Sequence, residues 1–381
     1  MSLTPTDPQL THIEPLRELF YAHYRFQYLS AACEFGLFEL LSREPGLTRA
    51  QVAERLGIEQ QPARILLLGC VSAGLLRKEG DGYHNTPVSE PLAGKLDDVP
   101  AAFVPWEQHV NYRPMAWFYE SLKANTNIGL QREIPGDSPT LYGRLALDPK
   151  RETTFHNMMG SVSRLVAEEL VQQLDLSPYT HLLDVGGGTA VNATYLARRW
   201  PNLRVTIVDL PTIAETANQK IASLGLQDRV RAVGLDAFND EFPKGCDAVL
   251  FGHFLEIWSV ERNKDLIAKA ARAVEPGAGI FVVTPGADDD ETGPDLAAAL
   301  SAYFLTVASG EGMVYTCAEY EQWFAEAGFE PAGRRSFSGP AAIRAGHRSW
   351  TRGGGPAPAR PRRRRPARRW SARPRSARRR R

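Results

Sequence analysis

Cysteine is scarce in this chain, with four cysteines among 381 residues. None of them lies in a CxxC pair or a Cys/His spacing, so the sequence excludes a disulfide framework and a structural zinc site. We predict no metal, and we expect all four to be ordinary buried thiols: Cys33, Cys70, Cys246 and Cys317.

Long hydrophobic runs are also absent. No stretch is as long as a membrane span, which needs about 18 consecutive apolar residues. The opening "MSLTPTDPQL" lacks the charged-then-apolar pattern of an export signal. We therefore expect a cytoplasmic protein without a membrane partner. A hydrophobic content of 43% supports a globular core, and 381 residues favour two domains of unequal size.

Acidic residues and lysine are missing from residues 334–381, which hold 18 arginines. The remaining part, 1–333, has 27 basic and 44 acidic residues, a net charge of −17. Such an acidic body is a poor partner for nucleic acid, although the Arg-rich tail could bind a nucleic acid or an acidic surface. The composition of the tail predicts disorder, with no buried strand beyond its first few residues. Arg, Ala, Pro and Gly would also result from a shifted reading frame of a GC-rich gene, and we favour this origin.

The N-terminal segment has the pattern of a winged-helix module. Apolar residues recur at three- and four-residue spacing from about Pro15 to Leu41, which predicts one helix with a wide face that should be buried, against another subunit if not against its own chain. Thr48 and Gly57 mark the two ends of a short helix, a second helix leads to Gly74, and a hairpin follows. Because its basic residues are matched by acidic ones, we favour a scaffolding or dimerisation role over DNA binding.

From His181 the pattern changes to strands that alternate with helices, whereas residues 100–175 are helical and aromatic. This alternation predicts an α/β fold with a parallel, doubly wound Rossmann-like sheet. The first strand delivers Asp184 and then Gly186, Gly187 and Gly188 before a helix, a turn that lets a ligand approach the backbone. Val191 occupies the third glycine position of a GxGxxG motif, which disfavours a dinucleotide.

The next two strands add two further acids. Asp209 ends the second strand, where a carboxylate can accept both hydroxyls of a ribose. After the third strand, Asp236 can reach an adenine amino group and Phe238 can cover the adenine face. Each feature alone has an ordinary structural explanation, but their order at successive strand ends predicts a nucleoside cofactor.

These residues resemble the bacterial and plant small-molecule O-methyltransferases that carry an N-terminal winged-helix dimerisation domain. The resemblance spans about residues 12–335 and is carried by "DVGGGTA", "VDLP", "DAF" and "EPG". It implies S-adenosylmethionine as cofactor, a small aromatic substrate and a homodimer. It also implies cofactor contacts at Asp184, Gly186, Gly187, Gly188, Asp209, Leu210, Asp236, Ala237, Phe238 and Gly252, and substrate contacts at His109, Phe155, Met159 and Trp258.

The catalytic position departs from this family. Where its members typically carry "HDW", with the histidine as base, this chain has Glu256, Ile257 and Trp258. The two supporting acids are also missing, because their positions fall near Val283 or Thr284 and on Val314. Glu256 could act as a base if an apolar pocket raised its pKa, and His253 is the other candidate; a histidine that only caps the strand is an equal alternative.

Loss of the usual histidine opens a second chemistry, because a phenolate is nucleophilic at its ortho carbon as well as at oxygen. The segment "HFLEIWS" is similar to relatives that methylate ring carbons of tyrosine-like or hydroxyanthranilate-like precursors of natural products. We therefore favour ring C-methylation slightly over O-methylation. A nicotinamide oxidoreductase, a winged-helix DNA-binding regulator and a catalytically inactive relative stay as alternatives.

The resulting prediction has four parts. Residues 1–100 form the winged-helix dimerisation domain and 101–175 a helical linker around the substrate pocket. Residues 176–335 form the Rossmann-like cofactor-binding domain, and 336–381 form the disordered tail. Family members normally add two apolar strands after the position of Phe329, and we expect this sheet edge to be incomplete here.

Overall fold

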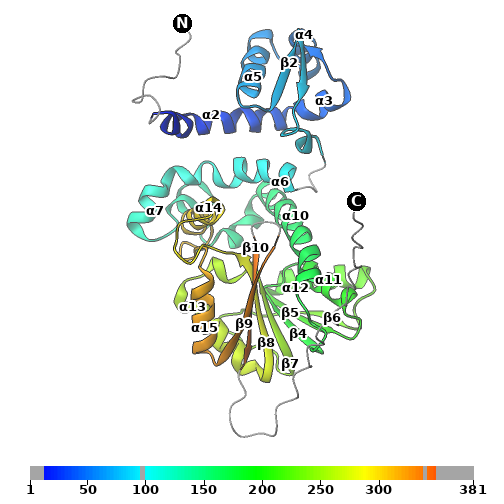
Figure 1. Cartoon of the computed structure of the whole chain (residues 1–381), viewed down its shortest axis with the longest axis vertical. Coiled ribbons are helices and arrows are strands. Elements are labelled where there is room, and N and C mark those ends of the chain that lie inside the picture. Colours follow the sequence, from blue (N-terminus) through cyan, green and yellow to red (C-terminus); the bar gives the residue numbers. More distant parts are fainter. Residues whose placement is uncertain (1–12, 95–98, 338–340, 349–381) are drawn as a thin grey trace, which may run out of the picture. The chain divides into compact units, whose positions relative to one another are not determined.

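The computed structural model describes residues 13–94, 99–337 and 341–348 (Figure 1). Most of the Arg-rich tail, with its predicted disorder and its suggested contact to nucleic acid, lies outside these residues. Within them, no helix is long and apolar enough to cross a membrane. None of the four cysteines, which all lie in the described part of the chain, forms a disulfide; Cys70 and Cys246 are buried, whereas Cys33 and Cys317 are half-buried.

The N-terminal module has the predicted helices and wing. Thr48 begins α4 with a capping box to Gln51, and Gly57 ends it in a left-handed conformation with φ of 66°. The predicted single helix 15–41 is wrong, because Gly36 also adopts a left-handed φ of 66° and divides it. The elements are α2 (Glu14–Glu34), α3 (Leu37–Arg43), β1 (Leu47–Thr48), α4 (Arg49–Leu56), α5 (Gln60–Ser72), β2 (Leu76–Glu79) and β3 (Gly82–Asn85).

The wide apolar face of α2 is largely exposed within one chain. Leu19 is 70% exposed, Phe20 63% and Tyr24 55%, whereas the C-terminal half of the helix packs on α5. The described residues of the chain therefore leave this face uncovered. Large apolar side chains that gather on one exposed face mark an interaction surface.

The middle segment is helical, as predicted. Its helices pack around a hydrophobic core cluster that includes Trp106, Leu141, Met158, Tyr303 and Val314. The elements are η1 (Glu90–Ala93), α6 (Val99–Trp106), η2 (Glu107–Asn111), η3 (Pro114–Trp117), α7 (Phe118–Ala124), α8 (Ile128–Glu133), α9 (Leu141–Arg144), η4 (Leu145–Leu147) and α10 (Pro149–Gln173), joined by α14 (Asp295–Tyr303) and η6 (Phe304–Ala308) from later in the chain.

The predicted α/β class and doubly wound sheet are confirmed. The seven described strands have the order β6-β5-β4-β7-β8-β10-β9, and the first five are parallel. The order reverses between β4 and β7, which is where such sheets bind ligands. The elements are β4 (His181–Val185), α11 (Val191–Arg199), β5 (Arg204–Asp209), α12 (Pro211–Ser223), β6 (Val230–Gly234), β7 (Cys246–Gly252), η5 (Leu255–Ile257), α13 (Val260–Ala273), β8 (Val274–Pro285), α15 (Cys317–Glu326), β9 (Phe329–Ser336) and β10 (Ala341–Arg348).

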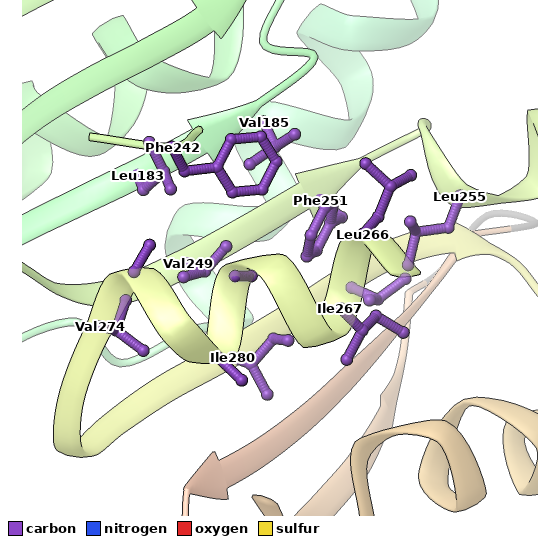
Figure 2. Close-up of a cluster of buried hydrophobic side chains, with 14 of the residues drawn as sticks. Leu183, Val185, Phe242, Val249, Phe251, Leu255, Leu266, Ile267, Val274 and Ile280 are labelled. Carbon is purple, nitrogen blue, oxygen red and sulfur yellow. The ribbon is translucent and has the colours of Figure 1, made fainter. Parts of the chain in front are cut away.

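Helices cover both faces of this sheet. Strand β8 shows the reason, because Ile280 and Val282 enter one core while Phe281 and Val283 enter the other. Figure 2 shows the first core, in which Leu266 and Ile267 of α13 lie against the strands. Helices α13 and α15 cover this face, and α10, α11 and α12 cover the opposite one (Figure 1).

The expectation of an incomplete sheet edge is wrong. Strand β10 pairs antiparallel with β8 on one side and with β9 on the other, although it lies inside the predicted disordered tail. In β9 only Phe329 is buried and the other seven residues are exposed. Backbone pairing to a buried neighbour thus extends the sheet with few apolar side chains, which composition alone did not reveal.

This pairing predicts different effects for two truncations. A chain that ends at Arg348 keeps every described strand, so we expect its midpoint of thermal unfolding to be unchanged. A chain that ends at Ser338 loses β10, the only described partner of β9, and we expect its midpoint to fall by about 5 °C or more. Calorimetric melting of both would measure this, and equal midpoints would contradict the role of β10.

Candidate functional site

The glycine turn after β4 requires its glycines. Gly186 and Gly188 have positive φ angles of 70° and 55°. A Cβ atom on Gly186 would lie 2.3 Å from the Phe254 ring, and one on Gly187 would lie 2.6 Å from Oδ2 of Asp184. The turn therefore brings bare backbone between β4 and the start of α11.

Asp184 lies below this turn without a partner. It is fully buried, and neither carboxylate oxygen has a hydrogen bond to any described residue. Burial, and then the charge of Asp209, raise the pKa of Asp184 to about 7. A buried carboxylate without donors is destabilising on its own, so this position is suited to a ligand that brings donors or positive charge.

Asp209 at the end of β5 ties the turn to its neighbour. Its Oδ2 accepts a hydrogen bond of 2.9 Å from the Gly188 N–H, and its Oδ1 accepts one of 2.8 Å from the Leu210 N–H. Burial raises the pKa of Asp209, against the effect of these two bonds. The structure thus brings six predicted residues together, because Asp184 and the three glycines share one turn, with Asp209 and Leu210 beside it.

The segment after β6 is held by a lysine that the sequence analysis missed. Lys269 of α13 is 8% exposed, and its Nζ donates hydrogen bonds of 2.7 to 2.8 Å to the carbonyl oxygens of Ala237, Phe238 and Asp240. Three acceptors around one ammonium fix the course of the segment. In the sequence, the signal for this role is that Lys269 lies on a helix face whose other residues are mainly apolar.

Two side chains of this segment are further ordered. Asp236 accepts hydrogen bonds from the Phe238 N–H and the Asn239 amide; burial alone would raise its pKa, but these bonds hold it below the ordinary value. The Phe238 ring meets Trp258 edge-on, with centroids 4.7 Å apart, and the Arg262 guanidinium lies 4.5 Å from the Phe238 centroid. Phe238 and Trp258, predicted for cofactor and substrate, are therefore in direct contact.

The two candidate bases form a pair after β7. His253 Nδ1 lies 3.2 Å from Glu256 Oε1, and their side chains are 15% and 3% exposed. The other atoms, His253 Nε2 and Glu256 Oε2, are buried and have no hydrogen-bond partner among the described residues. In the tautomer in which Nδ1 donates its proton to Glu256 Oε1, Nε2 keeps a free lone pair.

His253 reaches this position through an unusual backbone. Its φ of 51° is left-handed, which is uncommon for a residue other than glycine, and its N–H donates to the Val283 carbonyl at 2.8 Å. The preceding Gly252 leaves room for Asn192, because a Cβ there would lie 2.9 Å from its Nδ2. The expected family acids are replaced by residues that the structure buries: Val283, Thr284 and Val314.

Four rings from separate helices, which we name the aromatic box, belong to the core cluster that also contains Ile257 and Trp258, the two residues after Glu256. Trp106 contacts Phe155 and Tyr303 with centroid distances of 5.7 and 5.2 Å, and Tyr142 meets Phe155 edge-on at 5.9 Å. Burial, and then the charge of Glu256, raise the pKa of Tyr142. Of the predicted substrate residues, Phe155 belongs to the box, while Tyr142 and Tyr303 were not predicted.

Two predicted substrate residues lie differently. His109 Nε2 is 2.8 Å from Glu34 Oε1, so its hydrogen bond leads to α2 and not to His253 or Glu256. Met159 is half-buried, whereas its neighbour Met158 belongs to the core cluster of the helical segment. The substrate roles of His109 and Met159 stay predictions without support from these contacts.

Comparison with known proteins identifies the class. An O-methyltransferase domain matches residues 122–330, more than half of the chain, and an O-methyltransferase dimerisation domain matches residues 17–95. The chain therefore belongs to the O-methyltransferase family with an N-terminal dimerisation domain. This result decides against the nicotinamide oxidoreductase and the winged-helix regulator.

Individual relatives give a narrower picture. The chain is 40% identical to the L-tyrosine C(3)-methyltransferase of Streptomyces lavendulae, over 86% of this chain and 89% of the relative. It is 31% identical to the 3-hydroxy-5-methyl-1-naphthoate 3-O-methyltransferase of Streptomyces sahachiroi, over 86% and 92%. The solved structure of the S-adenosylmethionine-dependent methyltransferase SibL, also 40% identical, matches with a TM-score of 0.77 over 89% of this chain and all of that one.

The protein is thus an S-adenosylmethionine-dependent methyltransferase, and its strand ends fit that cofactor. The glycine turn provides an open backbone cradle, and the unpartnered Asp184 provides an acceptor for a cationic ligand. When bound, the cofactor supplies an electrophilic methyl group. The roles of single residues in holding it stay predictions, which the geometry at Asp209, Asp236 and Phe238 supports.

The raised pKa of Asp184 predicts a pH effect on stability. Its folded pKa of about 7 exceeds the unfolded value of about 3.9, so between these pH values the folded state binds the proton more tightly and gains stability as the pH falls. We expect the difference in unfolding free energy between wild type and Asp184→Asn to shift by about 1 to 2 kcal/mol in favour of wild type from pH 7.5 to 5.5. Urea denaturation of the cofactor-free proteins would measure it, and a pH-independent difference would refute it.

Proposed function

We propose that this enzyme methylates a small phenolic substrate in natural-product biosynthesis, with the ring carbon ortho to the hydroxyl favoured slightly over the oxygen. The observation that carries the proposal is the buried His253 and Glu256 pair, which stands beside the aromatic box and in place of the family's usual base. The similarity to an L-tyrosine C(3)-methyltransferase supports the carbon assignment, whereas the naphthoate 3-O-methyltransferase supports the oxygen alternative.

In this proposal His253 is the base and Glu256 orients it. Glu256 accepts the Nδ1 proton, so that Nε2 presents its lone pair to the phenolic hydroxyl. Proton transfer to Nε2 produces an imidazolium whose charge the buried carboxylate stabilises. This arrangement combines the two candidates of the sequence into one unit, in which Glu256 acts through His253.

The proton balance differs between the two acceptors. Methylation at oxygen releases the phenolic proton, which His253 takes up. Methylation at the ortho carbon gives a ring carbon that bears both the methyl group and a hydrogen; loss of this hydrogen as a proton restores the aromatic ring, and the oxygen regains its proton. In both cases one methyl group is transferred and one proton is released.

Variants of the pair test the mechanism. We expect His253→Gln to lower kcat by about 100-fold or more, and Glu256→Gln to lower it as well, while calorimetry shows unchanged affinity for S-adenosylhomocysteine. His84→Gln is a matched control, because His84 also pairs with a glutamate, Glu79, but lies in the wing. Full activity of Glu256→Gln would remove Glu256 from the mechanism.

The product decides between carbon and oxygen. The enzyme would be incubated with labelled cofactor and tyrosine, hydroxyanthranilate, salicylate-type and larger polyketide phenols, and the products examined by carbon and proton NMR. We expect a methyl signal on an aromatic carbon. A methoxy signal would refute the carbon assignment, and cofactor binding without transfer to any phenol would refute the proposed activity.

The dimerisation domain and the exposed face of α2 together support a homodimer. Burial of Leu19 and Phe20 against a second copy would remove their apolar surface from water. We expect Phe20→Glu to weaken the dimer in sedimentation experiments. Leu122→Glu on α7, where Leu122 is 55% exposed, is the control and should leave the dimer intact; an unchanged dimer in Phe20→Glu would place the interface elsewhere.

A further inference from the structure

A second acidic residue, Glu107, lies next to the aromatic box. Glu107 follows Trp106 directly, and its charge acts on Tyr303, whose pKa burial raises above its ordinary value. Burial also raises the pKa of Glu107 itself. Among the described ion pairs none involves Glu107, so no lysine, arginine or histidine of the described chain neutralises it.

Asn111 supplies an independent observation beside this carboxylate. It is only 5% exposed, and its Nδ2 donates a hydrogen bond of 3.0 Å to Glu107 Oε1. That bond fixes the amide orientation, because the opposite orientation would place two acceptor oxygens together. The Asn111 Oδ1 is then a buried acceptor with no partner among the described residues.

The backbone sets these two side chains apart from an ordinary helix. Residues Glu107–Asn111 form a π-helical turn, closed by a hydrogen bond of 2.8 Å from the Tyr112 N–H to the Glu107 carbonyl. Such turns often occur at functional sites, because the wider turn redirects side chains. A second π-helical turn, η6, follows Tyr303 directly. The backbone is therefore irregular both at Glu107 and next to Tyr303.

Two tyrosines connect this place to the proposed base. The Tyr303 and Tyr142 hydroxyls share a hydrogen bond; the charge of Glu107 acts on Tyr303, and the charge of Glu256 acts on Tyr142. Glu107 and Glu256 therefore both act electrostatically on this pair of hydroxyls. A substrate held in the aromatic box would have a carboxylate near each end.

We propose that Glu107 and Asn111 form a subsite for a protonated amine of the substrate, so that the enzyme selects aminoalkyl phenols over neutral or acidic ones. The proposal rests on the proposed phenol methylation. The Glu107 carboxylate and the Asn111 Oδ1, which has no partner among the described residues, are complementary to an alkylammonium group, which brings three N–H donors and a positive charge. A substrate carboxylate at that position would have no partner and would face the like charge of Glu107.

Calorimetry with the S-adenosylhomocysteine-loaded enzyme tests the subsite without turnover. Tyramine and 4-ethylphenol differ only in the amino group, which is protonated at pH 7. We expect wild type to bind tyramine about 10- to 100-fold more tightly than 4-ethylphenol. Glu107→Gln, which keeps the hydrogen bond from Asn111, should abolish this preference and leave the Kd of 4-ethylphenol unchanged.

Glu152→Gln is the control, because Glu152 has a 41% exposed side chain on α10 and pairs with His156. It should keep the full preference for tyramine. Equal affinity of wild type for both ligands, or an equal loss for both in Glu107→Gln, would overturn the subsite. If the preference holds but no phenol is methylated, the proposed reaction fails on its own; if both phenols are methylated with equal KM, the subsite fails on its own.

Discussion

The hydrogen bond from the Gly188 N–H to the Asp209 carboxylate is the interaction on which the rest of the site depends. This bond joins β5 to the turn after β4 and holds in place a backbone with two positive φ angles. This glycine turn also covers Asp184. The burial of Asp184 without hydrogen-bond donors is unfavourable, and the packed strands around it keep it buried. If the turn relaxed, water could solvate Asp184, and the position suited to a cationic ligand would be lost.

Unpartnered buried polar atoms gather around the carboxyl ends of the parallel strands. Asp184, His253 Nε2, Glu256 Oε2, the Asn192 Oδ1 and the Trp258 Nε1 all lack hydrogen bonds to described residues. Each such group lowers stability by about 1 to 3 kcal/mol while it lacks a partner, so a ligand that bonded to these atoms would stabilise the folded chain. By contrast, the buried ammonium of Lys269 has three acceptors, because its task is to fix the chain and not to bind a ligand.

The sequence predicted those parts of the fold that depend on neighbouring residues. The capping box at Thr48, the end of α4 at Gly57 and the glycine turn are local signals, and the alternation of strands and helices determines the sheet class. Features that depend on distant residues could not be predicted in this way. The partner of His109 is Glu34, which lies 75 residues away, and β10 forms because β8 offers it a paired edge. The aromatic box is of this kind, since Tyr142 and Tyr303 approach each other only in the folded chain.

In the proposed mechanism the proton acceptor is His253, three residues before the position at which the family carries its histidine. A base is defined by its lone pair and its surroundings, not by its place in a motif. His253 has a left-handed backbone, and its Nδ1 lies 3.2 Å from Glu256 Oε1; in the proposed mechanism this carboxylate selects the tautomer that leaves Nε2 free. Because strained residues of this type persist only where the surrounding structure holds them, the φ of 51° argues for a role beyond capping the strand. The acidic groups at Glu107 and Glu256 then serve one electrostatic purpose, since both favour positive charge near the box, on the substrate amine at one end and on the protonated His253 at the other.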